Sequence, residues 1–292
     1  MKRATCNNTP DLIFCSDFHL RETQPICRLD DYANVTQWEK VDFIANLQVK
    51  YNCPVLHAGD LFDHWKPSPN LLRETMVHIP DEFYTIYGQH DLPQHSLELA
   101  DKCGINVLLE AGIINLLPGS HWGQDPIQSI LINHFPVLVW HIFNYQGVKP
   151  WPDCTSPMAA KLLRQYPQYP IIVTGDNHKP FVESYEGRLL VNPGSIARMD
   201  ADQIDHKPRV YLWYAETNTV EPVYIPIKDN VITREHIELK KERDERIEAF
   251  ISQLHDSKWK VSMSFEQNLK MYEEQNKPRE SVMQIVYKSI NQ

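Results

Sequence analysis

Short apolar runs that lead directly into polar loops recur through the first two-thirds of the chain. They are rich in Val, Ile, Leu, Phe and Tyr and lie at residues 12–15, 54–56, 83–87, 129–132 and 171–174. Runs of this kind are typical of buried β-strands. Segments with helical periodicity or capping signals lie between them, at residues 38–50, 69–77, 96–103 and 156–166. This alternation of strands and helices predicts an α/β sandwich.

The pattern changes after residue 188. Three closely spaced strands are expected at residues 188–191, 208–215 and 220–227. A strongly charged stretch, 233–254, and two further segments, 264–274 and 279–290, then favour helices. We therefore expect two parts, a main domain at residues 1–228 and a small helical segment at residues 229–292.

Composition narrows the class of protein. The 292 residues carry a net charge of −9, which excludes a simple cationic nucleic-acid coat but not a nuclease whose carboxylates hold metal ions. The first 228 residues hold 18 basic and 26 acidic residues, so most of the negative charge lies there. Six cysteines form no CxxC pair, and no apolar run reaches the roughly 18–20 residues of a membrane span. We expect a soluble cytoplasmic protein without a membrane partner.

Metal-binding residue types follow five of the predicted strands. They are carboxylates, imidazoles and one amide: Asp17, His19, Asp60, Gln89, His90, Asp91, His134, Asp176 and His178. Glycines stand directly before Asp60, Gln89 and Asp176, where the chain must turn sharply. Functional groups collect at the carboxyl ends of strands in open α/β sheets. Carboxylates and histidines without a thiolate favour Mn, Fe or Zn.

In this order the motifs resemble the calcineurin-like metallophosphoesterase family, whose pattern is D-x-H, GD, GNH(D/E), H and G-H-x-H. The resemblance covers residues 12 to about 195 and implies a four-layer αββα sandwich. The segment Asp60-Leu61-Phe62-Asp63 with its preceding glycine looks like the GDLFD of SbcD-type DNA-repair nucleases. The segment 192–195 (NPGS), followed by Arg198, is similar to a segment after the last metal motif of those nucleases.

The resemblance implies two divalent cations, for which we expect Mn, with Fe, Zn or Mg as alternatives. It assigns the first cation to Asp17, His19, Asp60 and His178, with Asp60 bridging to the second. It assigns His134 to the second cation, places His90 near the scissile phosphate with Asp91 orienting it, and suggests Arg198 as a substrate contact. Two positions depart from the pattern: Gln89 replaces asparagine, and Asp176 replaces the first histidine of G-H-x-H. Both belong to the second-cation side, where Asp176 adds an oxygen ligand and a negative charge.

Three functions remain open from the sequence. The first is a metal-dependent phosphodiesterase acting on DNA, of SbcD type, whose helical segment caps the site or binds an SMC-like ATPase or a second copy of the chain. The second is a phosphoesterase for nucleotides or other small phosphate esters. The third is a non-catalytic interaction module on the same fold, which the departures at Gln89 and Asp176 motivate.

Overall fold

The computed structural model describes residues 9–127, 130–256 and 265–290. Its contacts divide the chain into two units, Met1–Arg234 and Glu235–Gln292. The division falls six residues beyond the boundary expected at 228/229, directly before the first helix of the second unit. None of the helices in the described residues combines the length and the apolar character that crossing a bilayer requires.

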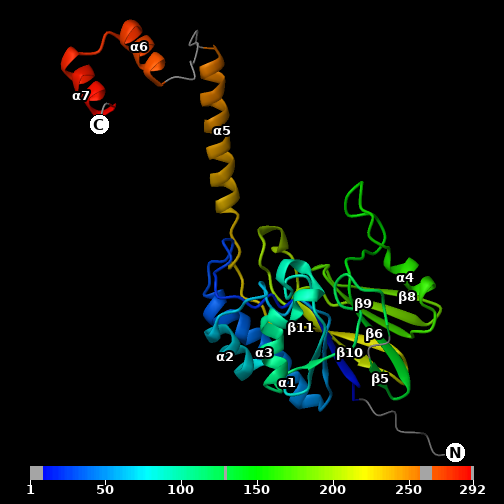
Figure 1. Ribbon diagram of the computed structural model, residues 1–292. Coiled ribbons are helices and arrows are strands. Elements are labelled where there is room, and N and C mark those ends of the chain that lie inside the picture. The colour runs from blue at the N-terminus through cyan, green and yellow to red at the C-terminus, as the bar shows by residue number, and fades with distance from the viewer. Residues whose placement is uncertain (1–8, 128–129, 257–264, 291–292) are drawn as a thin grey trace, which may run out of the picture. The chain divides into compact units, whose positions relative to one another are not determined.

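Two β-sheets form the centre of the first unit (Figure 1). The first has the order β11-β10-β1-β2-β3-β4, and the second has the order β5-β6-β7-β9-β8. The strands of the first sheet are β1 (Leu12–Cys15), β2 (Val55–His57), β3 (Phe83–Thr85), β4 (Asn115–Leu116), β10 (Arg209–Tyr214) and β11 (Thr219–Tyr224). Those of the second are β5 (Ile130–Ile132), β6 (Phe135–His141), β7 (Ile171–Gly175), β8 (Phe181–Tyr185) and β9 (Arg188–Asn192). Strands β1–β4 are mutually parallel, as are β6, β7 and β9.

The α-helices that the structure describes in the first unit are α1 (Gln37–Tyr51), α2 (Pro69–His78), α3 (Gly104–Glu110) and α4 (Ala159–Gln165). Short π- or 3₁₀-helical turns lie at Tyr32–Thr36, Pro93–His95, Leu97–Lys102 and Ala201–Gln203. Helix α2 begins as its sequence predicts, because the Ser68 hydroxyl accepts a hydrogen bond from the Leu71 amide and Pro69 occupies the first turn.

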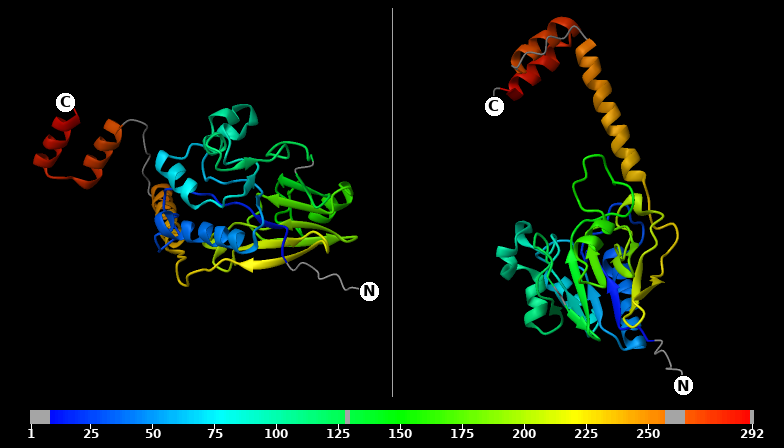
Figure 2. Two further views of the ribbon diagram at one scale, coloured as in Figure 1. Left: turned by 90° about the horizontal axis from the view of Figure 1, so that it is seen from below. Right: turned by 90° about the vertical axis from the view of Figure 1, so that its right-hand side faces the viewer.

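The two sheets lie against each other and against helices (Figure 2), and alternation along the strands places buried side chains in three core clusters of the described residues. Leu12 and Phe14 of β1 point into the core between the two sheets, whereas Ile13 of the same strand packs against helices α1–α3. On the far side of the second sheet, Leu138 and Ile172 pack against α4. The structure confirms the predicted α/β sandwich with its small C-terminal helices.

The described part of the second unit, residues 235–256 and 265–290, holds three helices: α5 (Glu235–Asp256), α6 (Phe265–Asn276) and α7 (Glu280–Ile290). Helices α6 and α7 contact each other through a hydrogen bond of 2.9 Å from the Tyr287 hydroxyl to the Glu273 carboxylate. Met283 of α7 is buried.

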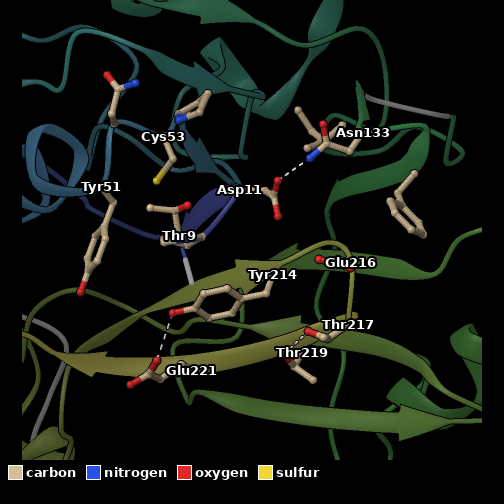
Figure 3. Close-up of a pocket in the computed structure, with 15 residues that line it drawn as sticks. Thr9, Asp11, Tyr51, Cys53, Asn133, Tyr214, Glu216, Thr217, Thr219 and Glu221 are labelled. Atoms are coloured by element: carbon tan, nitrogen blue, oxygen red, sulfur yellow. Dashed lines mark hydrogen bonds between the residues drawn. The ribbon is translucent and has the colours of Figure 1, made fainter. Parts of the chain in front are cut away.

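An open cavity lies where strands β1 and β2 begin (Figure 3). Asp11, Cys53 and Asn133 are among the residues that line it. The Asp11 carboxylate is engaged there, because it accepts hydrogen bonds from the Ala215 amide at 2.7 Å and from the Asn133 side chain. Among the described residues that line this cavity there is no histidine; the candidate metal-binding residues lie at the other ends of the strands.

Candidate metal centre

The predicted motifs meet at the carboxyl ends of parallel strands from both sheets. In the first sheet, Asp17 follows β1 and Asp60 follows β2, and these two strands pair in parallel. In the second sheet, Asp176 and His178 follow β7. The backbone joins the two sheets at this edge, since the Asp176 amide donates a hydrogen bond of 3.0 Å to Oδ1 of Asp17. One edge of each sheet therefore contributes side chains to a single site.

Ligand atoms gather there in three overlapping groups. The groups are Asp17–His19–His178, His19–Asp60–His90 and Asp17–Asp60–His141, and within each group the candidate ligand atoms lie within 4.8 Å of one another. Carboxylates and imidazoles at this spacing are the donors that first-row divalent ions prefer. Asp17, His19 and Asp60 each belong to two of these groups, so these side chains would serve neighbouring cation positions.

One oxygen of Asp60 shows that the residues fit such a cation. Asp60 is fully buried, and its Oδ1 accepts a hydrogen bond of 2.9 Å from the His90 amide. Its Oδ2 has no hydrogen-bond partner but lies 3.4 Å from Nε2 of His141 and 3.7 Å from Nε2 of His19. A buried carboxylate oxygen without a donor is costly. A cation between these three atoms would satisfy it.

The four residues nominated for the first cation lie close together: Asp17, His19 and His178 share one group of candidate ligand atoms, and His19 and Asp60 share another. The Nε2 atoms of His19 and His178 lie 3.1 Å apart, so both rings point at one position. Burial lowers the pKa of His19 to about 3, although the Asp60 carboxylate opposes this shift. His19 is therefore a neutral imidazole with a lone pair to offer. Asp17 is held by the Ser16 hydroxyl, which donates to its Oδ2 at 2.6 Å.

The second-cation side contains His141 in place of His134. Asn133 and His134 form the exposed turn between antiparallel strands β5 and β6, and both have positive φ angles. His134 therefore lies at the amino end of β6, away from the site. His141 is the last residue of the same strand and pairs in register with Gly175 of β7. The sequence interpretation ended the strand at residue 132, whereas the chain makes a hairpin and continues through a second apolar run, 135–140.

His141 is buried and fixed at both ring nitrogens. Its Nδ1 donates to the carbonyl oxygen of Ala58 at 2.6 Å, and its Nε2 lies 2.7 Å from Oε1 of Gln89. Burial alone would lower the pKa of His141, but the adjacent Asp60 carboxylate outweighs it and raises the pKa to about 10. The same pair holds the pKa of Asp60 below its ordinary value despite burial. The Asp60 carboxylate thus stabilises positive charge at the position where the second cation is expected.

The two departures from the family pattern contact each other. Nε2 of Gln89 donates a hydrogen bond of 2.6 Å to Oδ1 of Asp176, while its oxygen faces His141. The longer side chain of glutamine therefore spans the gap between the other two second-side residues. A cation at this position would lie beside Oε1 of Gln89, Oδ2 of Asp60 and Nε2 of His141, and it would replace the contact between the Gln89 oxygen and the His141 nitrogen.

Asp91 holds the backbone rather than His90. Its Oδ2 accepts from the amides of Asp60 and Gly88 at 2.9 and 3.0 Å, and its Oδ1 accepts from the Phe62 amide at 3.0 Å. Burial and the Asp60 carboxylate raise its pKa to about 7, while these backbone donors oppose the rise. The predicted orienting role of Asp91 is wrong, because both of its oxygens are used to shape the Asp60 loop.

His90 is oriented by a residue that the sequence analysis did not nominate. Its Nδ1 lies 3.0 Å from the carbonyl oxygen of Asp63. Because a carbonyl oxygen can only accept a hydrogen bond, Nδ1 carries a proton, and Nε2 lies on the side of the ring that faces away from Asp63. The Asp63 side chain lies 3.9 Å from Nδ1 of His19 and 3.2 Å from Arg21. In the sequence, the signal for this role is the second aspartate of the GDLFD segment, which follows the Asp60 ligand by three positions.

Arg198 is a structural residue, not a substrate contact. Its guanidinium is buried and donates to the carbonyl oxygens of Ile204 at 3.2 Å and Lys228 at 2.7 Å. These bonds tie the segment after Ser195 to the chain that follows β11. A buried guanidinium committed to two carbonyls cannot reach a phosphate without losing them.

Strained backbone accompanies the ligands. Asp17, His19, Asp60 and Asp176 all have φ between 46° and 76°, a region that non-glycine residues rarely occupy and that clusters at functional sites. Gly59 has a φ of 93°, and a Cβ there would lie 2.4 Å from Nδ1 of His141. Because Gly59 has no side chain, the Asp60 loop can pass directly against the ring of His141.

A family profile matches most of the chain. Residues 11–213 match the profile of the calcineurin-like phosphoesterase superfamily domain. The chain belongs to this superfamily. A search of curated protein sequences gives no match. Among solved structures, one described as a novel archaeal phosphodiesterase aligns with a TM-score of 0.42 and 13% identity, covering 73% of this chain and 98% of that one.

Membership of the calcineurin-like phosphoesterases makes the chain a metal-dependent hydrolase of phosphate esters. In such a site, divalent cations polarise the phosphate and make water nucleophilic near neutral pH. Asp17, His19, Asp60, His178 and His141 are the residues that would hold them, joined by Gln89 and Asp176 on the second side.

Proposed function

We propose that this calcineurin-like phosphoesterase is a phosphodiesterase that acts on DNA, of SbcD type. The orphaned Oδ2 of Asp60 between two imidazoles carries the hydrolytic part of this proposal. The choice of DNA is supported by two sequence segments that resemble those nucleases, the GDLFD at residues 59–63 and the NPGS at residues 192–195.

Both segments support the centre physically. Asp63 of the first segment contacts His19 and orients His90. In the second segment, the Ser195 amide donates to the carbonyl oxygen of His178 at 3.2 Å. Gly194 has a φ of 72°, and a Cβ there would lie 2.6 Å from the same carbonyl oxygen. The resembling residues are therefore part of the site's support.

His90 is the residue that we assign to the leaving group. Its Nδ1 proton is held by the Asp63 carbonyl. The doubly protonated ring, with a second proton on Nε2, can therefore deliver that Nε2 proton to the departing oxygen and keep the one on Nδ1. Its amide also fixes Oδ1 of Asp60, which couples the position of the ring to the bridging carboxylate. Replacing the ring should lower turnover while this backbone contact remains.

Manganese is the cation that we propose for the second side. Asp60, Gln89 and Asp176 would supply oxygen atoms and His141 one nitrogen, a set harder than that of the family pattern because aspartate replaces histidine. Under saturating Mn, metal analysis should find two ions per chain. A single ion per chain would contradict this part of the proposal.

The substrate class is tested by comparing polymer and small ester. Purified protein with Mn is given single-stranded and duplex oligonucleotides of defined sequence and, separately, p-nitrophenyl phosphate esters, with Asp60→Asn as the control. Hydrolysis of DNA that is abolished in the control supports the proposal. Hydrolysis of the small esters alone would assign the chain to small phosphate esters, and hydrolysis of neither would leave an interaction module.

We propose that the C-terminal helical segment, residues 229–292, binds a partner. We also propose that the protein acts in the cytoplasm. Helix α7 exposes Val282 and Ile285 while Met283 is buried, so apolar side chains remain on its surface. An SMC-like ATPase or a second copy of this chain is the partner proposed from the resemblance. Size-exclusion chromatography with light scattering distinguishes a homodimer from a monomer.

A further inference from the structure

The loop between β6 and α4, residues 142–158, carries two aromatic rings in contact, a partly buried Phe143 and an exposed Trp151, beside the metal centre. It leaves β6 directly after His141 and projects beyond the end of the second sheet (Figures 1 and 2). The ring centroids of Phe143 and Trp151 lie 5.3 Å apart with an interplanar angle of 50°. Trp151 remains 48% exposed. A half-exposed tryptophan that packs against a second ring is a surface that can accept another flat group.

The base of this loop is fixed to the centre. The side-chain amide of Asn177, which stands between Asp176 and His178, donates to the carbonyl oxygen of Asn144 at 2.7 Å. Tyr145 pairs with Met158 and closes the loop. The chain of contacts therefore runs from His178 through Asn177 and Asn144 to Phe143, and from its ring to Trp151.

The surroundings of the ring pair suit a nucleic acid. Lys149 in the same loop and Lys179 next to His178 are both exposed, and Val148 is 87% exposed. Cations beside apolar surface match a strand whose phosphates are anionic and whose bases are flat and apolar. Neither an acidic peptide nor a free phosphate would use the rings.

We propose that Phe143 and Trp151 form a stacking platform for the nucleobase adjacent to the scissile phosphate. The platform holds one base of a single strand or of a frayed duplex end, and so places the neighbouring phosphodiester at the metal centre. Stacking is insensitive to base identity, because every base has a flat face. This inference rests on the proposed function, since it requires a nucleic-acid substrate.

The test compares two substrates with the same phosphodiester backbone, one that carries nucleobases and one that lacks them. Wild type, Trp151→Ala and Trp151→Phe are assayed with Mn on a short oligothymidylate and on an abasic oligomer with the same sugar-phosphate backbone. We expect Trp151→Ala to raise KM for the oligothymidylate about tenfold, with kcat little changed and KM for the abasic oligomer unchanged. Trp151→Phe should recover most of the loss. Tyr224→Ala removes an aromatic ring exposed on β11 and should change neither value.

The outcomes separate failure of the platform from failure of the proposed function. An equal rise in KM on both oligomers would show that the ring only supports the loop, and no rise on either would show that it does not touch the substrate. Each result would overturn the platform while nuclease activity stands. Wild-type protein that hydrolyses a p-nitrophenyl diester but neither oligomer would instead overturn the choice of DNA. Thermal unfolding of each variant checks that the loop variants fold.

Discussion

The two ends of the same strands differ in how their polar side chains are used. At the beginning of β1, Asp11 bonds to a backbone amide and to Asn133, so it is already partnered. At the end of β1, Asp17 lies in a group of candidate metal ligands. Strand β6 shows the same contrast, with exposed His134 at one end and buried His141 at the other.

Strand direction explains the difference. The parallel strands of both sheets deliver their following loops to one edge, where short turns bring donors from separate parts of the chain within reach of each other. At the amino ends, the residues line a cavity and satisfy local backbone groups instead. Position along a strand, rather than residue type, therefore decides which aspartate or histidine contributes to the centre.

Replacing one aspartate by asparagine at each end of the strands should give the largest difference in activity. We expect Asp60→Asn to reduce kcat by at least about a thousandfold, because the bridging carboxylate would lose a negative charge shared by both cation positions. Asp11→Asn should leave kcat within about twofold, since a distant surface change does not reach the transition state. Steady-state hydrolysis of a p-nitrophenyl diester with Mn measures both. Comparable losses in the two variants would show that the centre has been placed at the wrong edge.

The two histidines of β6 provide the next contrast. His141→Ala should lower activity about a hundredfold and reduce the bound metal, because the second side would lose its nitrogen donor. His134→Ala should leave activity and metal content unchanged, since that ring is exposed in the β5–β6 turn. Activity assays and metal analysis of the dialysed proteins test the pair. A loss confined to His134→Ala would restore the interpretation made from the sequence.

Those two histidines also show how far the sequence can predict the site. Asp17, His19, Asp60 and His178 each follow a single well-separated apolar run, so pattern alone places them at strand ends. The stretch from 129 to 141 contains two apolar runs separated by a tight turn, and periodicity cannot tell which run enters the parallel part of the sheet. The choice is made by pairing of β6 with β7, a contact between distant parts of the chain.

Other features depend on tertiary contacts in the same way. The carboxylate of Asp91 follows His90 in the sequence, which suggested that it orients the ring, yet folding brings backbone amides of residues 60–62 to it. Arg198 was suggested as a substrate contact because it follows a motif, and it is buried against carbonyl groups. The left-handed backbone at Asp17 and Asp60 is likewise imposed by the surrounding structure, because local preference opposes it.

The free energy of unfolding should also depend more on an aspartate at the carboxyl ends of the strands than on one at their amino ends. Asp91→Asn replaces one of two acceptor oxygens by an amide that faces backbone donors, so we expect the free energy of unfolding to fall by about 3 kcal/mol. Asp11→Asn affects an acceptor near the surface and should cost about 1 kcal/mol or less. Urea denaturation of the metal-free proteins measures both values. Equal costs would mean that the Asp60 loop does not depend on the Asp91 carboxylate.

The smallest expected effect distinguishes the two cation positions from each other. Asp176→Asn removes a negative oxygen donor from the second side but retains the backbone amide that donates to Asp17, so the first side should be undisturbed. We expect the affinity for the second Mn to fall about tenfold and that for the first to stay within about twofold. Isothermal titration calorimetry of the metal-free protein resolves the two steps. Glu221→Gln at the opposite cavity is the matched loss of charge, and it should alter neither step. If Asp176→Asn weakened the first step as well, the two positions would share more than the Asp60 carboxylate, and the division of the centre into two sides would have to be abandoned.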